Sequence, residues 1–457
     1  MPSWNIVFGS PLLSRRSWLQ AGSLSLLGGS WLQAAPRTSP IDHQGWGRAR
    51  QCVILFMWGG PSHLDTFDPK PSAPPEIRGP FSAIETNVPG IHISEHFTQM
   101  ARRMDRVALI RSLTHDDPAH LSSVHTLLTG HLPPVNKSDA VPPSDRDTPH
   151  LGCVMAHLRP SDSPLPRFVT MPWIVSHPAA PGGKAPGQHG GWLGRQYDPF
   201  LVTGDPNADG WQVPALALQP GQTQTRLATR RSLLVQLDQA RRSLSQRLPR
   251  QVADQQQQAF DVLTAPIVRE AFDIHWESPE TRERYGRNIH GQCVLLARRL
   301  LDYEVPVVAV NWHDDHQNFW DTHGNNFNRL KNDLIPPSDR ALAALLDDLQ
   351  ASGRLDHTIV LWVGEFGRSP HINGSAGREH HPFCYCGLLA GAGIRGGQVY
   401  GRSDPQGAFP ADNPVSPSDL TATLYHALGV AADTTLHDNL QRPHRIINGT
   451  PLTTLFG

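Results

Sequence analysis

Histidines and carboxylates collect in short segments that directly follow apolar runs of the sequence. The chain contains 24 histidines. Imidazole and carboxylate without thiolate form a ligand set for zinc, manganese or iron, and less so for calcium. These segments are far apart along the chain, so several regions supply candidate ligands. The candidate metal ligands are His63, Asp65, Asp321, His323, Glu365 and His380.

Supply of ligands from several segments suits a centre with two metal ions. Two ions roughly 3.5–4 Å apart hold both the attacking and the leaving oxygen of an in-line displacement. Other interpretations stay open for some of these residues. Asp65 and Asp68 could cap a turn that begins at Gly59-Gly60-Pro61, and residues 313–316 could form a solvated loop.

The apolar runs before these segments predict strands buried on both faces of a sheet. Helix candidates alternate with them at residues 281–303 and at residues 338–351, where Ser338 is the expected N-cap. This alternation predicts an α/β fold with a mostly parallel sheet between helices. Ligands of such sheets bind at the carboxyl ends of the strands. The expected strands cover residues 52–57, 107–110, 168–171, 305–310 and 358–363, with shorter ones at 387–389 and 398–400.

The composition excludes several classes of protein. Among the 457 residues, 40 are Lys or Arg and 41 are Asp or Glu, so the chain lacks the basic balance typical of nucleic-acid binding. Its five cysteines form no CxxC pair, which excludes a zinc ribbon or a thioredoxin-type site. We expect a single α/β domain over residues 36–457, with long insertions near 131–165 and 172–260. Residues 226–260 of the second insertion predict an exposed amphipathic helix or a pair of helices.

The first residues predict an export signal. Residues 14–20 read Ser-Arg-Arg-Ser-Trp-Leu-Gln, which resembles a twin-arginine signal, and a weakly apolar run follows up to Ala35. This run is too short to span a bilayer, and small residues at Ala34 and Ala35 suit cleavage. We therefore expect residues 1–35 to be a signal peptide read by the twin-arginine export machinery. The mature chain would be periplasmic or extracellular, with no membrane span.

Several multi-residue motifs, in order, resemble domain-of-unknown-function family 1501, which looks like a branch of the alkaline phosphatase and sulfatase superfamily. This resemblance implies an alkaline phosphatase-like three-layer sandwich, a mostly parallel central sheet with helices on both faces and a metal site at the strand ends. The motifs are the segments 59–69, Leu127-Leu128-Thr129-Gly130, Arg284-Tyr285-Gly286, Trp320-Asp321-Thr322-His323-Gly324, Glu365-Phe366-Gly367-Arg368 and Gly377-Arg378-Glu379-His380.

The superfamily pattern carries over to this chain only in part. Asp321 and His323 resemble its Asp-x-x-x-His metal pair with shorter spacing, and His380 resembles its final histidine. Glu365 stands at the first position of its late Asp-His pair, whereas Phe366 replaces the second ligand. The aspartate of its first strand would fall near Trp58 or Gly59, where no ligand stands, so the resemblance implies His63 or Asp65 as the substitute ligand.

The nucleophile position of sulfatases falls on His120 in the same resemblance, with Ser122 and Ser123 nearby. None of the five cysteines begins the Cys-x-Pro-x-Arg type of motif that a formylglycine nucleophile needs, and Ser122 and Ser123 have no arginine four residues further on. Both observations argue against that class of sulfatase. The candidate catalytic residues are therefore His120, Ser122 and Arg111. The candidate substrate-binding residues are Arg368, Arg378, His115 and His381.

Two functions follow from these residues. The first is an exported hydrolase of phosphate or sulfate esters that uses one or two divalent ions (zinc, manganese or calcium). Its substrate would be an anionic ester or a sulfated or phosphorylated polysaccharide, which arginine binds in a bidentate manner. The alternative is a non-catalytic binding protein of the same fold that contacts polysaccharide or a cell-surface partner.

Export gives the first testable prediction. Changing Arg15 and Arg16 together to lysine keeps the charge but removes the guanidinium pair that defines the motif. We expect the precursor of this variant to stay in the cytoplasm, as measured by cell fractionation and immunoblotting. A matched change of Arg37 to lysine, beyond the expected signal, should leave export unaltered. Export of the double variant at the wild-type level would contradict the assignment.

Overall fold

The computed structural model describes residues 44–177, 184–217, 229, 260–312 and 319–457. An eight-stranded sheet lies at the centre of these residues, in the order β12-β4-β11-β8-β1-β7-β5-β6. Every neighbouring pair is parallel except those made by β11, which runs antiparallel to both β4 and β8. The strands are β1 (Gln51–Phe56), β4 (Val107–Leu113), β5 (Phe168–Met171), β6 (Phe200–Leu201), β7 (Val307–Asn311), β8 (Thr358–Val363), β11 (Tyr385–Ala390) and β12 (Gln398–Tyr400).

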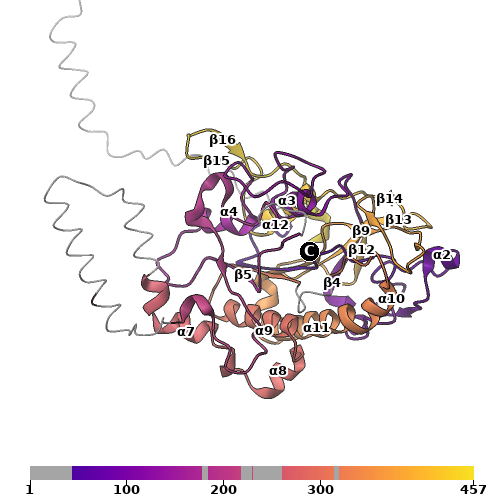
Figure 1. The fold of residues 1–457 in the computed structure, drawn as a ribbon, viewed down its shortest axis with the longest axis horizontal. Helices are drawn as coiled ribbons and strands as arrows, with labels where there is room; N and C mark the ends of the chain where they lie inside the picture. Colours follow the sequence, from indigo (N-terminus) through magenta and orange to yellow (C-terminus); the bar gives the residue numbers. More distant parts are fainter. Residues whose placement is uncertain (1–43, 178–183, 218–228, 230–259, 313–318) are drawn as a thin grey trace, which may run out of the picture. The chain divides into compact units, whose positions relative to one another are not determined.

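Helices cover both faces of this sheet (Figure 1). On one face lie α3 (His120–Thr129), α4 (Leu151–Leu158) and α12 (Pro417–Ala427). On the other lie α7 (Pro266–Phe272), α9 (Ile289–Asp302) and α11 (Ile335–Ala351), with α8 (Pro279–Tyr285) packed outside them. The expected α/β architecture with a mostly parallel sheet is therefore confirmed. Within the described ranges, no helix combines the length and the apolar character that a bilayer crossing requires.

The strands form where the sequence is continuously apolar. All six residues of β1 and all six of β8 are buried, because helices shield both faces of the sheet. A single large core cluster joins these strands to the apolar sides of the helices. The expected strands at 168–171, 358–363 and 398–400 have the bounds that the structure gives, and the others differ from it by a few residues at their ends.

The two helix predictions need correction. Residues 281–303 form α8 and α9 instead of one helix, because Gly286 adopts a positive φ of 99° between them and Asn288 caps α9. Ser338 lies inside α11, which begins at Ile335, so it is not an N-cap. Its hydroxyl instead accepts a hydrogen bond from the indole of Trp362 at 2.9 Å, which ties α11 to β8.

Shorter elements complete the described structure. Within the expected insertion at 131–165, α4 packs on the sheet and buries Leu151, Cys153, Val154 and Met155. Residues 218–228 and 230–259 of the second insertion, with most of its expected helix, lie outside the described residues. The remaining elements are α2 (Pro75–Arg78), α10 (Asn326–Arg329) and the two-stranded ribbons β2 (Ala83–Glu85) with β3 (His92–Ser94), β9 (Gly367–Arg368) with β10 (His380–His381), β13 (Arg402–Ser403) with β14 (Pro410–Asp412), and β15 (Thr435–His437) with β16 (Pro443–Arg445).

Candidate metal centre

Polar side chains converge at the edge of the sheet where the parallel strands end. His120 opens α3, which follows β4, and Asp321 lies in the segment after β7. Glu365 and Arg368 follow β8, and His380 stands on β10, just before β11 returns into the sheet. Because β4, β7 and β8 point the same way, their carboxyl ends bring residues that are far apart in sequence to one edge.

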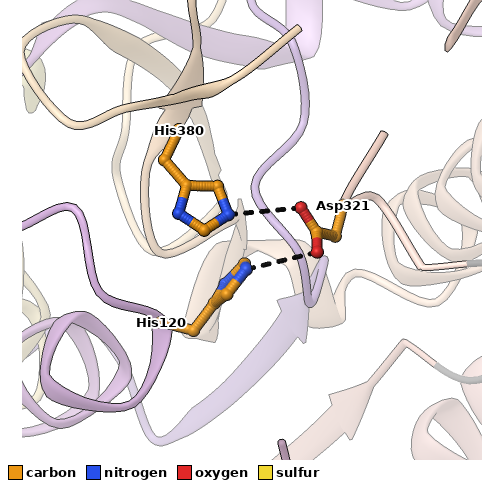
Figure 2. A group of neighbouring side chains, drawn as sticks. All are labelled: His120, Asp321 and His380. Carbon is orange, nitrogen blue, oxygen red and sulfur yellow. Dashed lines mark hydrogen bonds and ion pairs between the residues drawn. The ribbon is translucent and has the colours of Figure 1, made fainter. Parts of the chain in front are cut away.

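The Asp321 carboxylate is the centre of this group. Its Oδ2 lies 3.5 Å from His120 Nε2, and its Oδ1 lies 3.3 Å from His380 Nε2 and 3.0 Å from His323 Nε2. Figure 2 shows the His120 and His380 rings both directed at this carboxylate. One potential ligand atom each from His120, Asp321 and His380 lie within 4.8 Å of one another, which is close enough to share a metal ion.

The Nδ1 atom of each of the three imidazoles, on the side of the ring away from Asp321, also has a hydrogen-bond partner. His120 Nδ1 lies 2.6 Å from Glu365 Oε1, His323 Nδ1 lies 2.5 Å from Glu379 Oε2, and His380 Nδ1 lies 2.8 Å from the Pro118 carbonyl oxygen. Carboxylate and carbonyl oxygens only accept, so each Nδ1 carries the hydrogen and each neutral ring presents a lone pair at Nε2.

This donor set fits a divalent cation. In their neutral forms His120 and His380 present Nε2 lone pairs beside the Asp321 carboxylate, within 4.8 Å of one another, and His323 Nε2 lies 3.0 Å from Asp321 Oδ1. Such a gathering of acceptors is stabilised by a positive charge between them. His323 and His380 show this directly, because their Nε2 atoms lie only 3.0 Å apart. A histidine ligand whose second nitrogen is bonded to carboxylate or carbonyl is the usual arrangement at protein metal sites.

Charge and burial set the protonation of these groups. Burial opposes ionisation of Asp321, but the Arg368 guanidinium and the three histidines hold the pKa of that carboxyl well below its usual range. Burial also lowers the pKa of His380, so its ring is neutral near pH 7. For His120, burial acts downward, yet hydrogen bonds and charges from Asp321 and Glu365 outweigh it and raise its pKa to about 9.

The ribbon of β9 and β10 places two groups on Asp321 at once. Its register pairs Arg368 with His380, so both side chains leave the same side of the ribbon. Arg368 lies 2.5 Å from Asp321 Oδ1 and is fully buried. Its guanidinium also donates to the carbonyls of Gly59 and Gly60, which fixes the ribbon to the segment after β1.

Two glycines allow the segments of the centre to touch. Gly59 has a φ of +107°, and a Cβ there would stand 2.3 Å from the Asp321 backbone nitrogen. A Cβ on Gly377 would stand 2.0 Å from the His323 carbonyl oxygen. A side chain at either position would therefore displace the backbone that carries Asp321 or His323.

Asp65 and Arg378, a candidate ligand and a candidate substrate-binding residue, are bonded to each other. Arg378 Nε lies 2.7 Å from Asp65 Oδ2 and its second terminal nitrogen lies 3.0 Å from Oδ1, in a fully buried bidentate pair. Asp65 also accepts from Ser62 and Asn326. The structure therefore places both residues in a support for the segment after β1, outside the group around Asp321.

The candidate catalytic residues Arg111 and Ser122 are bonded to backbone. Arg111 donates to the carbonyls of Phe67 and His92 and lies 3.4 Å from Asp68. Ser122 is buried in α3, and its hydroxyl oxygen accepts from the backbone N–H of Ser138.

Three other candidate histidines have backbone partners. His63 Nε2 lies 2.7 Å from the Gly407 carbonyl, and burial lowers the pKa of this ring to about 4. His381 Nε2 lies 2.6 Å from the Ala408 carbonyl. His115 Nε2 lies 2.8 Å from the Glu365 carbonyl, so it touches the centre through the backbone of a residue that orients His120.

The structure adds residues that the sequence analysis did not single out. Glu379 holds His323, and the buried rings of Trp58 and Phe366 pack on His120 with centroids 4.9 and 4.8 Å away. His177, after β5, brings its ring centroid to 5.6 Å from that of His120. Position after a buried strand could have indicated His177, since the same rule identified His115. Residues 313–316 lie outside the described residues.

The fold and the centre thus define an α/β protein with a candidate metal site at the carboxyl edge of its sheet. The family model described as "Protein of unknown function (DUF1501)" matches residues 49–456, so the chain belongs to this family. No curated protein matches the chain.

Solved structures similar to the chain come from sulfatases and related proteins. The lipoteichoic acid synthase LtaP from Listeria monocytogenes is 9% identical, with 90% of this chain and 79% of that chain covered and a TM-score of 0.40. The PsFucS1 sulfatase from Pseudoalteromonas sp. is 12% identical, with 90% and 73% covered and a TM-score of 0.39. A protein in the alkaline phosphatase superfamily from Vibrio parahaemolyticus is 10% identical, with 90% and 71% covered and a TM-score of 0.37.

The Asp65–Arg378 pair gives a stability prediction. Changing Arg378 to methionine leaves a buried carboxylate without its main partner, so we expect the free energy of unfolding to fall by about 3–5 kcal/mol in chemical denaturation. Adding Asp65→Asn should recover part of this loss, because no unpaired charge then remains.

The exposed pair of Arg340 and Glu283 supplies the control. Arg340→Met should cost less than about 1 kcal/mol, because water screens exposed ion pairs. A loss for Arg378→Met no larger than for Arg340→Met would mean that the buried pair does not stabilise the fold.

Proposed function

We propose that this chain is an exported, metal-dependent hydrolase of phosphate or sulfate esters. The observation that supports it is the convergence of three imidazole Nε2 atoms on the Asp321 carboxylate, with each Nδ1 anchored by an acceptor. A scaffold that only binds a surface partner gains no stability from gathering acceptors in this way. An ester hydrolase does need such a site, because a cation bound there stabilises the negative charge of the reacting oxygens.

Asp321, His120, His323 and His380 would hold the ion. When bound, a divalent metal polarises an ester oxygen and makes water a better nucleophile near neutral pH. Glu365 and Glu379 orient His120 and His323 and keep their hydrogens on Nδ1. Trp58 and Phe366 pack on His120 and exclude water from the inner side. The substrate would enter beside His323, whose side chain is 44% exposed.

Water is the nucleophile that this geometry favours. The hydroxyl of Ser122 accepts from the Ser138 backbone, and that of Ser123 donates to the Asp117 carbonyl. Arg111, Arg368 and Arg378 are each committed to carbonyls and a carboxylate of the protein. The charge of an anionic ester would therefore be met mainly by the metal, so substrate binding should need the ion as much as the chemical step does.

The proposed compartment and substrate rest on the sequence. The expected twin-arginine signal places the chain in the periplasm or outside the cell, where sulfated or phosphorylated polysaccharides are available as anionic esters. The signal residues lie outside the described residues.

Metal content tests the proposed function. His380→Ala and His323→Ala each remove a ligand, so we expect both purified variants to lose most of their bound metal after dialysis, as measured by elemental analysis. His357→Ala is the control, because His357 precedes β8 at the opposite edge of the sheet. If the wild type binds no divalent metal, or both variants keep full content, the binding-protein alternative becomes the better explanation.

Metal affinity should depend on pH well above the range of an ordinary histidine. The metal-free protein holds a proton on His120 up to about pH 9, because Asp321 and Glu365 outweigh the effect of burial. A metal must displace this proton, so affinity should rise about tenfold per pH unit between pH 6 and 8.

Competition with a zinc chelator at several pH values measures this slope. Glu365→Gln removes one of the two carboxylates that raise the pKa of His120, and it should flatten the dependence near pH 8. An unperturbed histidine with a pKa near 6.5 would give a flat affinity above pH 7. A flat wild-type profile there would contradict the predicted competition.

A further inference from the structure

Arg368 is an unusual group to find in a metal centre. It is fully buried, and its guanidinium lies 2.5 Å from Asp321 Oδ1, the same oxygen that His323 and His380 approach. It also donates to the carbonyls of Gly59, Gly60 and Arg378. Because arginine stays protonated at any ordinary pH, a fixed positive charge is part of the centre.

The charges bonded to the centre can be counted. Asp321, Glu365 and Glu379 each contribute one negative charge, and Arg368 contributes one positive charge. With neutral histidines, two negative charges remain. One divalent cation brings this group to neutrality, whereas two divalent cations would leave it with two positive charges. Water screens the exposed Glu379, but Arg368 and Glu365 are fully buried, so the excess positive charge of a second ion would be poorly compensated there. The count therefore favours one ion.

Among the residues that the structure describes, no further side chain on the Arg368 side is free to hold a second ion. Both oxygens of Glu365 accept from the Gly59 backbone N–H, and Oε1 accepts from His120 as well. The segment after β1 contributes Gly59 and Gly60, which have no side chain that could bind a metal. Their carbonyl oxygens accept hydrogen bonds from the Arg368 guanidinium. In this part of the centre, the guanidinium fills the space between the segment after β1 and Asp321.

We infer that Arg368 serves as the second, built-in cation of the centre, and that the centre therefore binds one divalent metal ion rather than two. The inference rests on the proposed function, because it assumes that Asp321 and the histidines hold a metal. In this role, Arg368 neutralises and positions the Asp321 carboxylate, and it does not bind a substrate anion.

Metal stoichiometry of the wild-type chain is the primary test. We expect one zinc ion per chain after equilibration with excess zinc and gel filtration, as measured by elemental analysis. With manganese as the probe, electron paramagnetic resonance should show an isolated ion, because two ions about 3.5–4 Å apart would couple magnetically. Two equivalents of zinc, or a coupled manganese signal, would overturn the inference. No bound metal at all would instead overturn the proposed function.

Variants of Arg368 test the cause. Arg368→Met removes the charge with a similar volume, so we expect it to bind a second equivalent of zinc, or to bind the first at least tenfold more tightly. Arg368→Lys keeps the charge, so it should remain at one equivalent with an affinity near that of the wild type. One equivalent at wild-type affinity in Arg368→Met would show that the guanidinium does not act as a cation of the centre.

Loss of a buried arginine needs its own control. Arg282 is also buried, and it donates to Gln292 and to the Pro206 carbonyl, away from Asp321. Arg282→Met should keep one zinc ion at wild-type affinity, with circular dichroism to confirm folding of every variant. If Arg368→Met does not fold, the wild-type stoichiometry and the Arg368→Lys variant still decide the question.

Discussion

The ion pair between Asp321 and Arg368 is the interaction on which the rest of the centre depends. Asp321 is the carboxylate toward which three imidazoles turn, and Arg368 is the buried cation that keeps it ionised. The same guanidinium bonds the carbonyls of Gly59 and Gly60. One side chain thus joins the segments that follow β1, β7 and β8. A neutral residue there would leave a carboxylate that is costly to bury and free to move.

A second layer of bonds supports this pair without touching it. Arg378 and Asp65 tie the end of the 369–379 loop to the turn after β1, and the His115 ring bonds the Glu365 backbone. These groups have the residue types of an active site, yet their partners are internal. The candidate ligands, which range from the buried His120 to the half-exposed His323, therefore rest on a layer of buried ion pairs. Such a base holds ligand positions closely, which a metal site requires.

Local features of the sequence carried most of the information on the fold. Runs such as residues 358–363 predicted strands because burial on both faces demands continuous apolar residues. Their order, with helices between them, was enough to predict the mostly parallel sheet. The helix bounds failed where a single residue decided them, at Gly286 and at Ser338. The first depends on backbone conformation and the second on a contact with Trp362, which lies in another element.

Position after a strand identified the residues of the centre but not their tasks. Asp321, His323, Glu365 and His380 follow from that rule, and the structure brings them and His120 together. The role of each arginine depends on which partner the tertiary structure supplies. Arg368 and Arg378 are ten residues apart and equally buried, but one meets Asp321 and the other Asp65. Pairing between distant segments leaves no periodic trace in the sequence, so the contact of Glu379 with His323 could not be predicted. His177 follows β5, so the strand rule could have indicated it.

The proposed ligands are far apart along the chain, and this separation means that folding must precede metal binding. The groups that contact Asp321 come from residues 120, 323, 368 and 380, so no short segment of the polypeptide contains the complete site. An unfolded chain offers only isolated histidines, which bind metal weakly. An ion bound at the proposed site would therefore be acquired only after the sheet has closed, in whichever compartment folding is completed. The metal available in that compartment, more than any preference of the ligands, would decide which ion the protein carries.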